Sequence, residues 1–156
     1  MRPETLEIIT KSAKETKKVG EFLAGEIIKS KQALIIGLKG ELGSGKTTFI
    51  QGMARGLKIR ERITSPTFVI MKKYGVSLLE GGKKSLTAGR IPVSFYHIDC
   101  YRVQSKDLLD LGFKEIISQS NIVVIEWAEK IKKILPKNTF WIKFEYLDKD
   151  KRKITL

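Results

Sequence analysis

The sequence has a single cysteine, a single histidine and no long apolar run, and each scarcity excludes a class of protein. The lone Cys100 excludes an internal disulfide and a zinc site built from several cysteines, and we interpret it as a buried apolar side chain. No apolar stretch reaches the roughly 18 residues that span a bilayer, and the first residues lack the apolar segment of a secretory signal. We therefore expect a cytoplasmic protein with no membrane partner.

Acidic residues are also scarce, since 17 Asp and Glu stand against 30 Lys and Arg, a net charge of +13. A charge of this sign attracts phosphate-bearing polymers such as nucleic acids. The basic residues are spread along the chain, so a solvated lysine-rich surface explains the charge as well as an RNA-facing patch does. The length of 156 residues predicts one domain that spans residues 1–156.

The stretch Gly40–Thr47 fits the pattern G-x-x-x-x-G-K-[ST], known as the P-loop. Its glycines let the backbone present a row of N–H groups to phosphate oxygens. Lys46 supplies a positive charge for the terminal phosphates, and the Thr47 hydroxyl is expected to face a magnesium ion. The apolar run 33–38 precedes the motif and suits a buried parallel strand, and helical periodicity follows in 49–57. This context predicts a nucleotide site.

The remaining elements predict a mixed α/β fold around this strand and helix. Ser12 and Glu15 form a capping-box pattern before a helix, whose packed face we expect to carry Val19, Phe22, Leu23 and Ile27. The Gly- and Lys-rich stretch 75–90 predicts a surface excursion, with room for a short hairpin. Further predicted elements are a strand at 68–74, a strand at 93–98, helices within 104–118 broken at Gly112, a strand at 122–125, a helix at 129–134, and a hairpin of 139–146 with 153–156.

Two predicted strands are followed by a carboxylate, Asp99 after one and Glu126 after the other. Ligands of open α/β sheets bind beyond the carboxyl ends of the strands, which is where these acids are expected. One acid is predicted to hold magnesium beside Thr47, and the other to orient an attacking water. His97 shares a strand face with Asp99, and we interpret it as a hydrogen-bonding residue rather than a metal ligand. No sequence pattern identifies an arginine finger, the arginine that stabilises the charge of the transition state in phosphoryl transfer. We therefore expect weak ATPase activity from the isolated protein.

Four motifs occur in order along the chain, and together they resemble one family. They are GELGSGKTT at 40–48, SPTF at 65–68, HIDCYR at 97–102 and IEW at 125–127. In this combination the sequence resembles the TsaE (YjeE) family of bacterial P-loop ATPases over nearly its whole length. The resemblance implies a three-layer P-loop fold, in which a parallel core sheet is flanked by antiparallel strands. It also implies a role in making threonylcarbamoyladenosine beside the anticodon of tRNA, together with the proteins TsaB and TsaD. The connection to tRNA is expected to be indirect, and direct contact with tRNA stays an open alternative.

The resemblance also assigns roles to individual residues. It implies ATP as the nucleotide, Thr47 and Glu126 as the Mg²⁺ ligands, and Lys46, Asp99 and Thr67 as the residues that support hydrolysis. Trp127 is expected beside the nucleotide site or at a partner surface, and Lys11 to Ala13 and the turn near Asp150 are expected beside the base. The residues expected to bind the nucleotide are Gly40, Gly43, Ser44, Gly45, Lys46, Thr47, Thr48, Lys11, Ala13 and Trp127.

Some positions depart from the family pattern, and two alternative functions stay open. Ala128 stands where Pro or Ser is usual and Cys100 where Leu is usual, and the excursion at 75–90 is longer than usual. The first alternative is a kinase of nucleosides or metabolites, although arginine is sparse after the P-loop helix and no cluster predicts a lid. The second is a basic RNA-binding module with a decayed ATP site, which the intact Lys46, Thr47, Asp99 and Glu126 disfavour.

Overall fold

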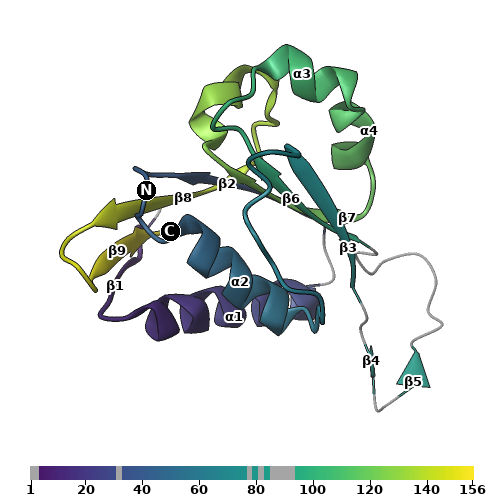
Figure 1. The fold of residues 1–156 in the computed structure, drawn as a ribbon. Coiled ribbons are helices and arrows are strands. Elements are labelled where there is room, and N and C mark those ends of the chain that lie inside the picture. The colour runs from purple at the N-terminus through teal and green to yellow at the C-terminus, as the bar shows by residue number, and fades with distance from the viewer. Residues whose placement is uncertain (1–3, 31–32, 77–78, 81–82, 85–93) are drawn as a thin grey trace.

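The computed structural model describes residues 4–30, 33–76, 79–80, 83–84 and 94–156 (Figure 1). In chain order the elements are β1 (Glu7–Thr10), α1 (Ala13–Ser30), β2 (Leu34–Lys39), α2 (Lys46–Gly56), β3 (Met71–Gly75), β4 (Leu79–Glu80), β5 (Lys83–Lys84), β6 (Ser94–Asp99), α3 (Ser105–Asp110), α4 (Phe113–Ser118), β7 (Asn121–Glu126), the 3₁₀ helix η1 (Ala128–Ile134), β8 (Phe140–Tyr146) and β9 (Arg152–Thr155).

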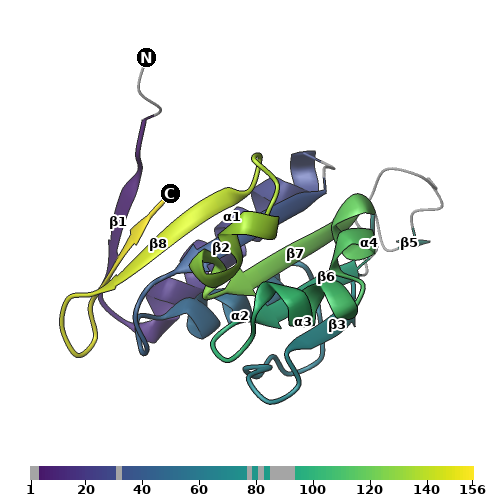
Figure 2. The same cartoon turned by 90° about the horizontal axis from the view of Figure 1, so that it is seen from above.

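Within the described residues, most strands join one seven-stranded sheet in the order β1-β9-β8-β2-β7-β6-β3. The central strands β8, β2, β7 and β6 run parallel, whereas β3 at one edge and β9 and β1 at the other pair antiparallel. Helices α1 and α2 lie on one face of this sheet and α3 and α4 on the other (Figures 1 and 2). The predicted three-layer fold with a parallel core and antiparallel flanks is therefore confirmed.

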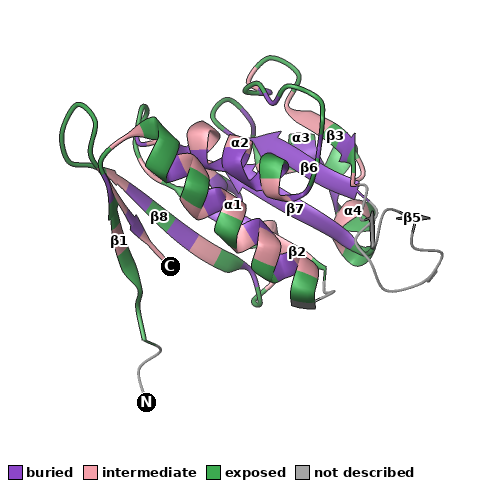
Figure 3. Ribbon diagram, turned by 90° about the horizontal axis from the view of Figure 1, so that it is seen from below, coloured by how far each residue is buried: buried purple, intermediate pink, exposed green. Residues whose placement is uncertain are grey.

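The two central strands β6 and β7 are buried along their whole length, as Figure 3 shows by colour. Helices cover both faces of these strands, which is why their sequences are nearly continuous apolar runs rather than alternating ones. On the α1 and α2 side the core includes Phe49, Met53 and Phe144, and on the opposite side it includes Leu108 and Phe113. The predicted strands 93–98 and 122–125 thus correspond to β6 and β7, although Val93 lies outside the described residues.

Helices α1 and α2 pack closely, because each helix places a glycine against the backbone of the other. A Cβ atom at Gly52 would collide with the carbonyl group of Lys17, and one at Gly20 would collide with that of Phe49. Gly56 is the last residue of α2, and a Cβ there would lie 2.7 Å from both Ala24 Cβ and the Glu21 carbonyl oxygen. These contacts bring α2 against α1 and fix the direction in which the P-loop helix leaves the sheet.

The structure corrects three details of the sequence prediction. Phe22 does not lie on the packed face of α1, because it is 71% exposed while Ala24 and Ile27 are buried. The strand predicted from Phe68 begins only at Met71, since the Pro66 carbonyl accepts hydrogen bonds from two following N–H groups and forms a turn. In the predicted capping box Ser12 caps Glu15, but the Glu15 carboxylate accepts from the N–H of Lys11 rather than of Ser12.

Other predicted elements are confirmed where the structure describes them. Gly112 has a left-handed φ of 80° and separates α3 from α4, and β8 and β9 form the terminal hairpin. Within the excursion at 75–90, β4 pairs with β5 as a short hairpin, and most of the other residues lie outside the described part. The single-domain prediction for 1–156 stays a prediction. In the described part of the chain, no helix has the length and apolarity that crossing a membrane requires.

Candidate nucleotide-binding site

The loop between β2 and α2 holds the Lys46 side chain against its own backbone. Lys46 Nζ donates hydrogen bonds to the carbonyl oxygens of Gly40 at 2.6 Å and Glu41 at 2.9 Å. Burial lowers the pKa of this ammonium group from 10.5, while the nearby carboxylates, Glu126 foremost, act in the opposite direction. The motif therefore keeps its cation at the loop, next to the backbone N–H groups that bind phosphate in P-loops.

Gly40 allows this loop to lie directly on the sheet. Its φ of 150° is a conformation that residues with a side chain rarely adopt, and a Cβ atom there would collide with the Phe144 carbonyl group of β8. The P-loop is thus packed on the end of a neighbouring strand, and Gly40 supports the loop rather than facing its open side.

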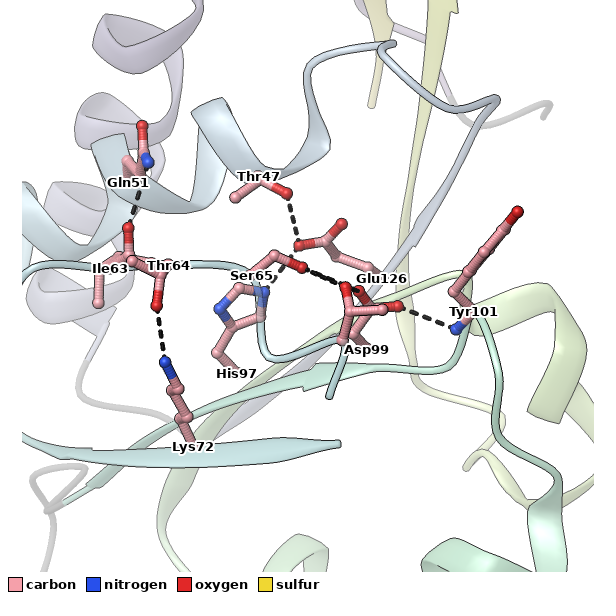
Figure 4. Close-up of polar contacts among 11 residues, drawn as sticks. Thr47, Gln51, Ile63, Thr64, Ser65, Lys72, His97, Asp99, Tyr101 and Glu126 are labelled. Atoms are coloured by element: carbon pink, nitrogen blue, oxygen red, sulfur yellow. Dashed lines mark hydrogen bonds and ion pairs between the residues drawn. The ribbon is translucent and has the colours of Figure 1, made fainter. Parts of the chain in front are cut away.

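Glu126 joins the P-loop helix to the central strands (Figure 4). The Thr47 hydroxyl donates a hydrogen bond to Glu126 Oε1 at 2.9 Å, and His97 Nε2 lies 2.8 Å from the same oxygen. This contact is satisfied by the His97 tautomer with its proton on Nε2, and Nδ1 has no hydrogen-bond partner among the described residues. His97 is fully buried and orients Glu126, in agreement with its predicted hydrogen-bonding role.

The oxygens of Thr47 and Glu126 fit the chemistry of a magnesium site. Mg²⁺ prefers hard oxygen ligands and typically takes one or two from the protein, with waters and substrate phosphates completing the shell. Among the described residues, no group of three or more His, Cys, Asp and Glu could hold a metal ion by itself. The arrangement therefore suits a cation that binds together with a nucleotide rather than one held in a cage of protein ligands.

Asp99 ties the loop after α2 to the end of the sheet. Thr67 Oγ1 and Ser65 Oγ donate to Asp99 Oδ2 at 2.8 and 3.1 Å, and the backbone N–H of Tyr101 donates to Oδ1 at 2.9 Å. Asp99 pairs with Glu126 in the parallel register of β6 and β7, so both carboxylates emerge side by side. The SPTF loop is thereby held next to the two acids, as Figure 4 shows for Ser65.

Trp127 follows Glu126 in a left-handed backbone conformation, with φ of 57°. Lys46 Nζ lies 4.3 Å from the centre of the Trp127 ring, a cation–π contact, and the Tyr101 ring packs against Trp127 at 5.1 Å. The aromatic side chain thus forms a wall beside the P-loop lysine.

These groups surround one cavity of about 620 Å³. Of the residues predicted from the sequence, the lining includes Ala13, Gly43, Ser44, Gly45, Lys46, Thr47, Thr48, Thr67, Asp99, Glu126, Trp127 and Asp150. Lys11 and Gly40 are not among its lining residues, and Gly40 packs on β8 instead. The volume lies within the range of small-molecule sites, about 300–1,000 Å³.

The lining also includes residues that were not assigned to the site from the sequence: Thr16, Leu42, Ser65, Tyr101, Arg102 and Arg152. Arg152 is the most informative, because its Nε donates to the Gly43 carbonyl at 3.0 Å and its Nη1 to carbonyls of the turn between β8 and β9. It clamps that turn to the P-loop. Only sheet pairing brings Arg152 to Gly43, since 109 positions separate them.

Known proteins are similar to this chain in fold and in sequence. A crystal structure of YdiB from Bacillus subtilis superimposes with a TM-score of 0.72 at 30% sequence identity, covering 97% of this chain and 84% of that one. The tRNA threonylcarbamoyladenosine biosynthesis protein TsaE of Treponema pallidum is 34% identical over 149 residues, which are 95% of this chain and 97% of that protein. The protein of the same name from Bacillus subtilis is 33% identical over 146 residues, 94% of this chain and 81% of that protein.

A family model described as threonylcarbamoyl adenosine biosynthesis protein TsaE matches residues 10–154. The match includes the P-loop, the SPTF loop, both carboxylates and the terminal hairpin. This chain therefore belongs to the TsaE family.

Proposed function

We propose that this protein is the ATP-binding and ATP-hydrolysing component of the machinery that forms N6-threonylcarbamoyladenosine next to the anticodon of tRNA, acting with TsaB and TsaD. Family membership and the names of its relatives support the pathway. The observation that carries the ATPase activity is the contact between Thr47 and Glu126 in the cavity that also holds Lys46. We propose a cytoplasmic location and no membrane partner, because the machinery acts on tRNA.

ATP would bind with its phosphates on the P-loop. Lys46 would exchange the carbonyl oxygens of Gly40 and Glu41 for phosphate oxygens, an exchange aided by the higher charge of the phosphates. Thr47 and Glu126 would hold Mg²⁺, which supplies positive charge to the β- and γ-phosphate oxygens. Trp127, Ala13 and Asp150, which also line the cavity, are the residues we assign to the sides of the nucleotide.

Asp99 and Thr67 would prepare the attack on the terminal phosphate. Asp99 lies beside Glu126 at the strand ends, where its carboxylate can accept a hydrogen bond from the attacking water. Thr67 is bonded to Asp99, and we assign its loop the role of a switch that would change partners when a phosphate arrives. A charged phosphate would compete for the Thr67 hydroxyl and thereby signal occupancy to the loop.

We expect low activity of the isolated protein because the arginines that line the cavity already contact other groups of the chain. Arg152 is bonded to backbone carbonyls, and Arg102 lies over the Phe68 ring at 5.6 Å. Among the described residues that line the cavity, these are the arginines present, and each is engaged elsewhere. Because an arginine that meets the transition state accelerates phosphoryl transfer strongly, we propose that TsaB and TsaD activate turnover.

The deciding experiment measures ATP hydrolysis by the full chain with and without TsaB and TsaD, together with the modified nucleoside in tRNA. We expect phosphate release into water to rise with the partners, and modified tRNA to require both ATP and Lys46. The Lys46→Ala variant should lose ATP affinity roughly 10- to 100-fold, because it removes a charged hydrogen-bond donor. Transfer of phosphate to an added nucleoside instead of water would show a kinase, and full modification by Lys46→Ala would refute the proposal.

A further inference from the structure

A second cleft lies away from the nucleotide cavity, and its lining is strongly basic. It has a volume of about 820 Å³ and is formed by α1, the carboxyl end of α2 and the loop that follows. Its charged residues are Lys17, Arg55, Lys58, Arg60 and Arg62, with Glu61 as the single acid. We refer to it as the basic cleft.

The cations of the basic cleft are uncompensated. Within the described part of the chain, none of the five side chains takes part in an ion pair, a hydrogen bond or a ring contact. Three cations near the nucleotide cavity differ, because Lys46, Arg152 and Lys130 are each bonded to backbone carbonyls. The basic cleft therefore concentrates five cations against the single acid Glu61, and none of the five is ion-paired within the described residues.

Stabilisation of a helix end does not account for this cluster. Arg55 and Lys58 lie at the carboxyl end of α2, where cations are favourable, but Arg60 and Arg62 lie beyond the last turn and Lys17 comes from α1. Lys58 also has a left-handed φ of 59° at a position after the helix where glycine is the usual residue. The chain thus has a lysine at a position where the left-handed backbone conformation favours glycine.

We propose that the basic cleft binds the phosphate backbone of RNA, and that the RNA is the tRNA of the proposed pathway. The apolar members of its lining, Ala54, Ile59 and Ile63, are buried, and the described lining includes no aromatic side chain. Such a surface lacks the exposed aromatic anchors of protein interfaces and the platforms on which bases stack. It has instead the cations that bind phosphates without regard to sequence.

The position of the basic cleft connects RNA to the nucleotide site. Gln51 Nε2 on α2 donates to the Ile63 carbonyl at 3.2 Å and anchors the loop at the edge of the cleft. The same loop continues to Ser65 and Thr67, which bond to Asp99. Phosphates at Arg60 and Arg62 and a nucleotide at Thr67 would thus occupy two ends of one loop. The identity of the RNA rests on the proposed function, whereas the phosphate binding does not.

The test is binding of an unmodified tRNA transcript to the full chain, measured by fluorescence polarisation across a salt series without nucleotide. The double variant Arg60→Ala/Arg62→Ala should bind about tenfold more weakly, and the slope of log affinity against log salt should fall by about two. An unrelated RNA of equal length should show the same change, since phosphates are contacted. Unchanged affinity of the double variant, or no binding by the unsubstituted protein, would overturn the proposal.

The matched control comes from a different cluster of cations on the same protein. The cleft beside α3 and η1 is lined by Arg102, Lys106, Lys130, Lys132 and Lys133 with Glu129, so it holds the same balance of charge. Lys132→Ala/Lys133→Ala removes two exposed cations and should leave tRNA affinity within about twofold of the unsubstituted protein. Equal losses in both double variants would show a general charge effect and refute the site. ATP affinity, measured in parallel, distinguishes this outcome from a failure of the nucleotide site.

Discussion

The Thr47 hydroxyl, in the first turn of α2, is bonded at 2.9 Å to Glu126, which lies 79 positions later in the chain. The contact arises because β2 and β7 are parallel neighbours, with Leu38 opposite Glu126 at their carboxyl ends. The P-loop leaves β2 at that level, so the helix that follows begins above the carboxylate. One sheet pairing therefore brings together the two oxygen ligands that we assign to magnesium.

Replacing Glu126 with Gln should remove the advantage that magnesium gives to ATP binding. The amide keeps an oxygen for the Thr47 and His97 hydrogen bonds but loses the negative charge that attracts the cation. We expect affinity for ATP with Mg²⁺ to fall about 10- to 100-fold, and affinity in EDTA to change little. Titrations of Glu126→Gln and of the unsubstituted protein with a fluorescent ATP analogue, with Mg²⁺ and with EDTA, provide the measurement.

Glu129→Gln is the control for this substitution, since Glu129 is an exposed carboxylate that also acts on Lys46. It should leave the difference between Mg²⁺ and EDTA intact. The assignment of Glu126 as the magnesium ligand fails if the two variants show the same magnesium dependence.

Replacing Asp99 with Asn should separate binding from turnover. The Asn side chain retains an oxygen for the hydrogen bonds from Ser65 and Thr67 and loses only the acceptor of the Tyr101 N–H, so the loop and ATP affinity should be kept. The loss of a group that orients water should lower kcat roughly 10²- to 10⁴-fold. Phosphate release at saturating ATP, in the presence of the partner proteins, measures the effect.

Asp110→Asn on α3 removes an exposed acid away from the cavity and serves as the comparison for Asp99. Its kcat should equal that of the unsubstituted protein. If Asp99→Asn turns over at the normal rate, Asp99 has no part in hydrolysis and supports only the loop.

Two glycine substitutions in the helical layer should have opposite effects on stability. Gly52→Ala places a methyl group onto the Lys17 carbonyl, so we expect the free energy of unfolding to fall by about 1–3 kcal/mol. Gly25→Ala in α1 has nothing within 4 Å of the added Cβ, and it should raise that free energy by roughly 0.5–1 kcal/mol. Urea denaturation of both variants tests the close packing of α1 on α2, which equal effects of the two substitutions would contradict.

The Cys100 thiol should be unreactive while the protein is folded. It is buried, and burial, reinforced by the Asp99 charge, raises its pKa from 9.0 to about 12. Iodoacetamide at pH 8 should therefore label the protein only in denaturant. Rapid labelling of the folded protein would show that the segment around Cys100 opens.

The same shift predicts a dependence of stability on pH. Above pH 9 the unfolded thiol loses its proton while the folded thiol keeps it until about pH 12. Stability from this group is thus fully present below pH 9 and is lost as the pH rises through that window. Cys100→Ala should show a shallower loss of unfolding free energy over this range than the unsubstituted protein.

The elements of the fold were largely predictable because their signals are local. The buried strands β6 and β7 appear as apolar runs, Gly112 marks the break between α3 and α4, and the P-loop has a fixed pattern. The misplaced strand start at Phe68 has a local cause as well, since the turn at Pro66 competes with the strand. Phe22 was assigned to the wrong face because the helical stripe that contacts α2 is built from small residues such as Gly20 and Ala24.

The sequence by itself determined which residue types the predicted nucleotide site contains. The P-loop pattern and the two acids after apolar runs specify residue types whose roles do not depend on where the chain travels between them. The order of the motifs then pointed to the TsaE family, which the comparisons show.

Only the tertiary structure decided which distant groups meet. The clamp of Arg152 on Gly43, the shared oxygen between Thr47 and His97, and the uncompensated cations of the basic cleft all depend on strand order and helix packing. Such contacts form across a sheet or between helices. No local sequence pattern predicts them, because the same residues could equally lie on a solvated surface. Short sequence segments thus specify the residue types of the site, and the fold decides which of these residues lie close together.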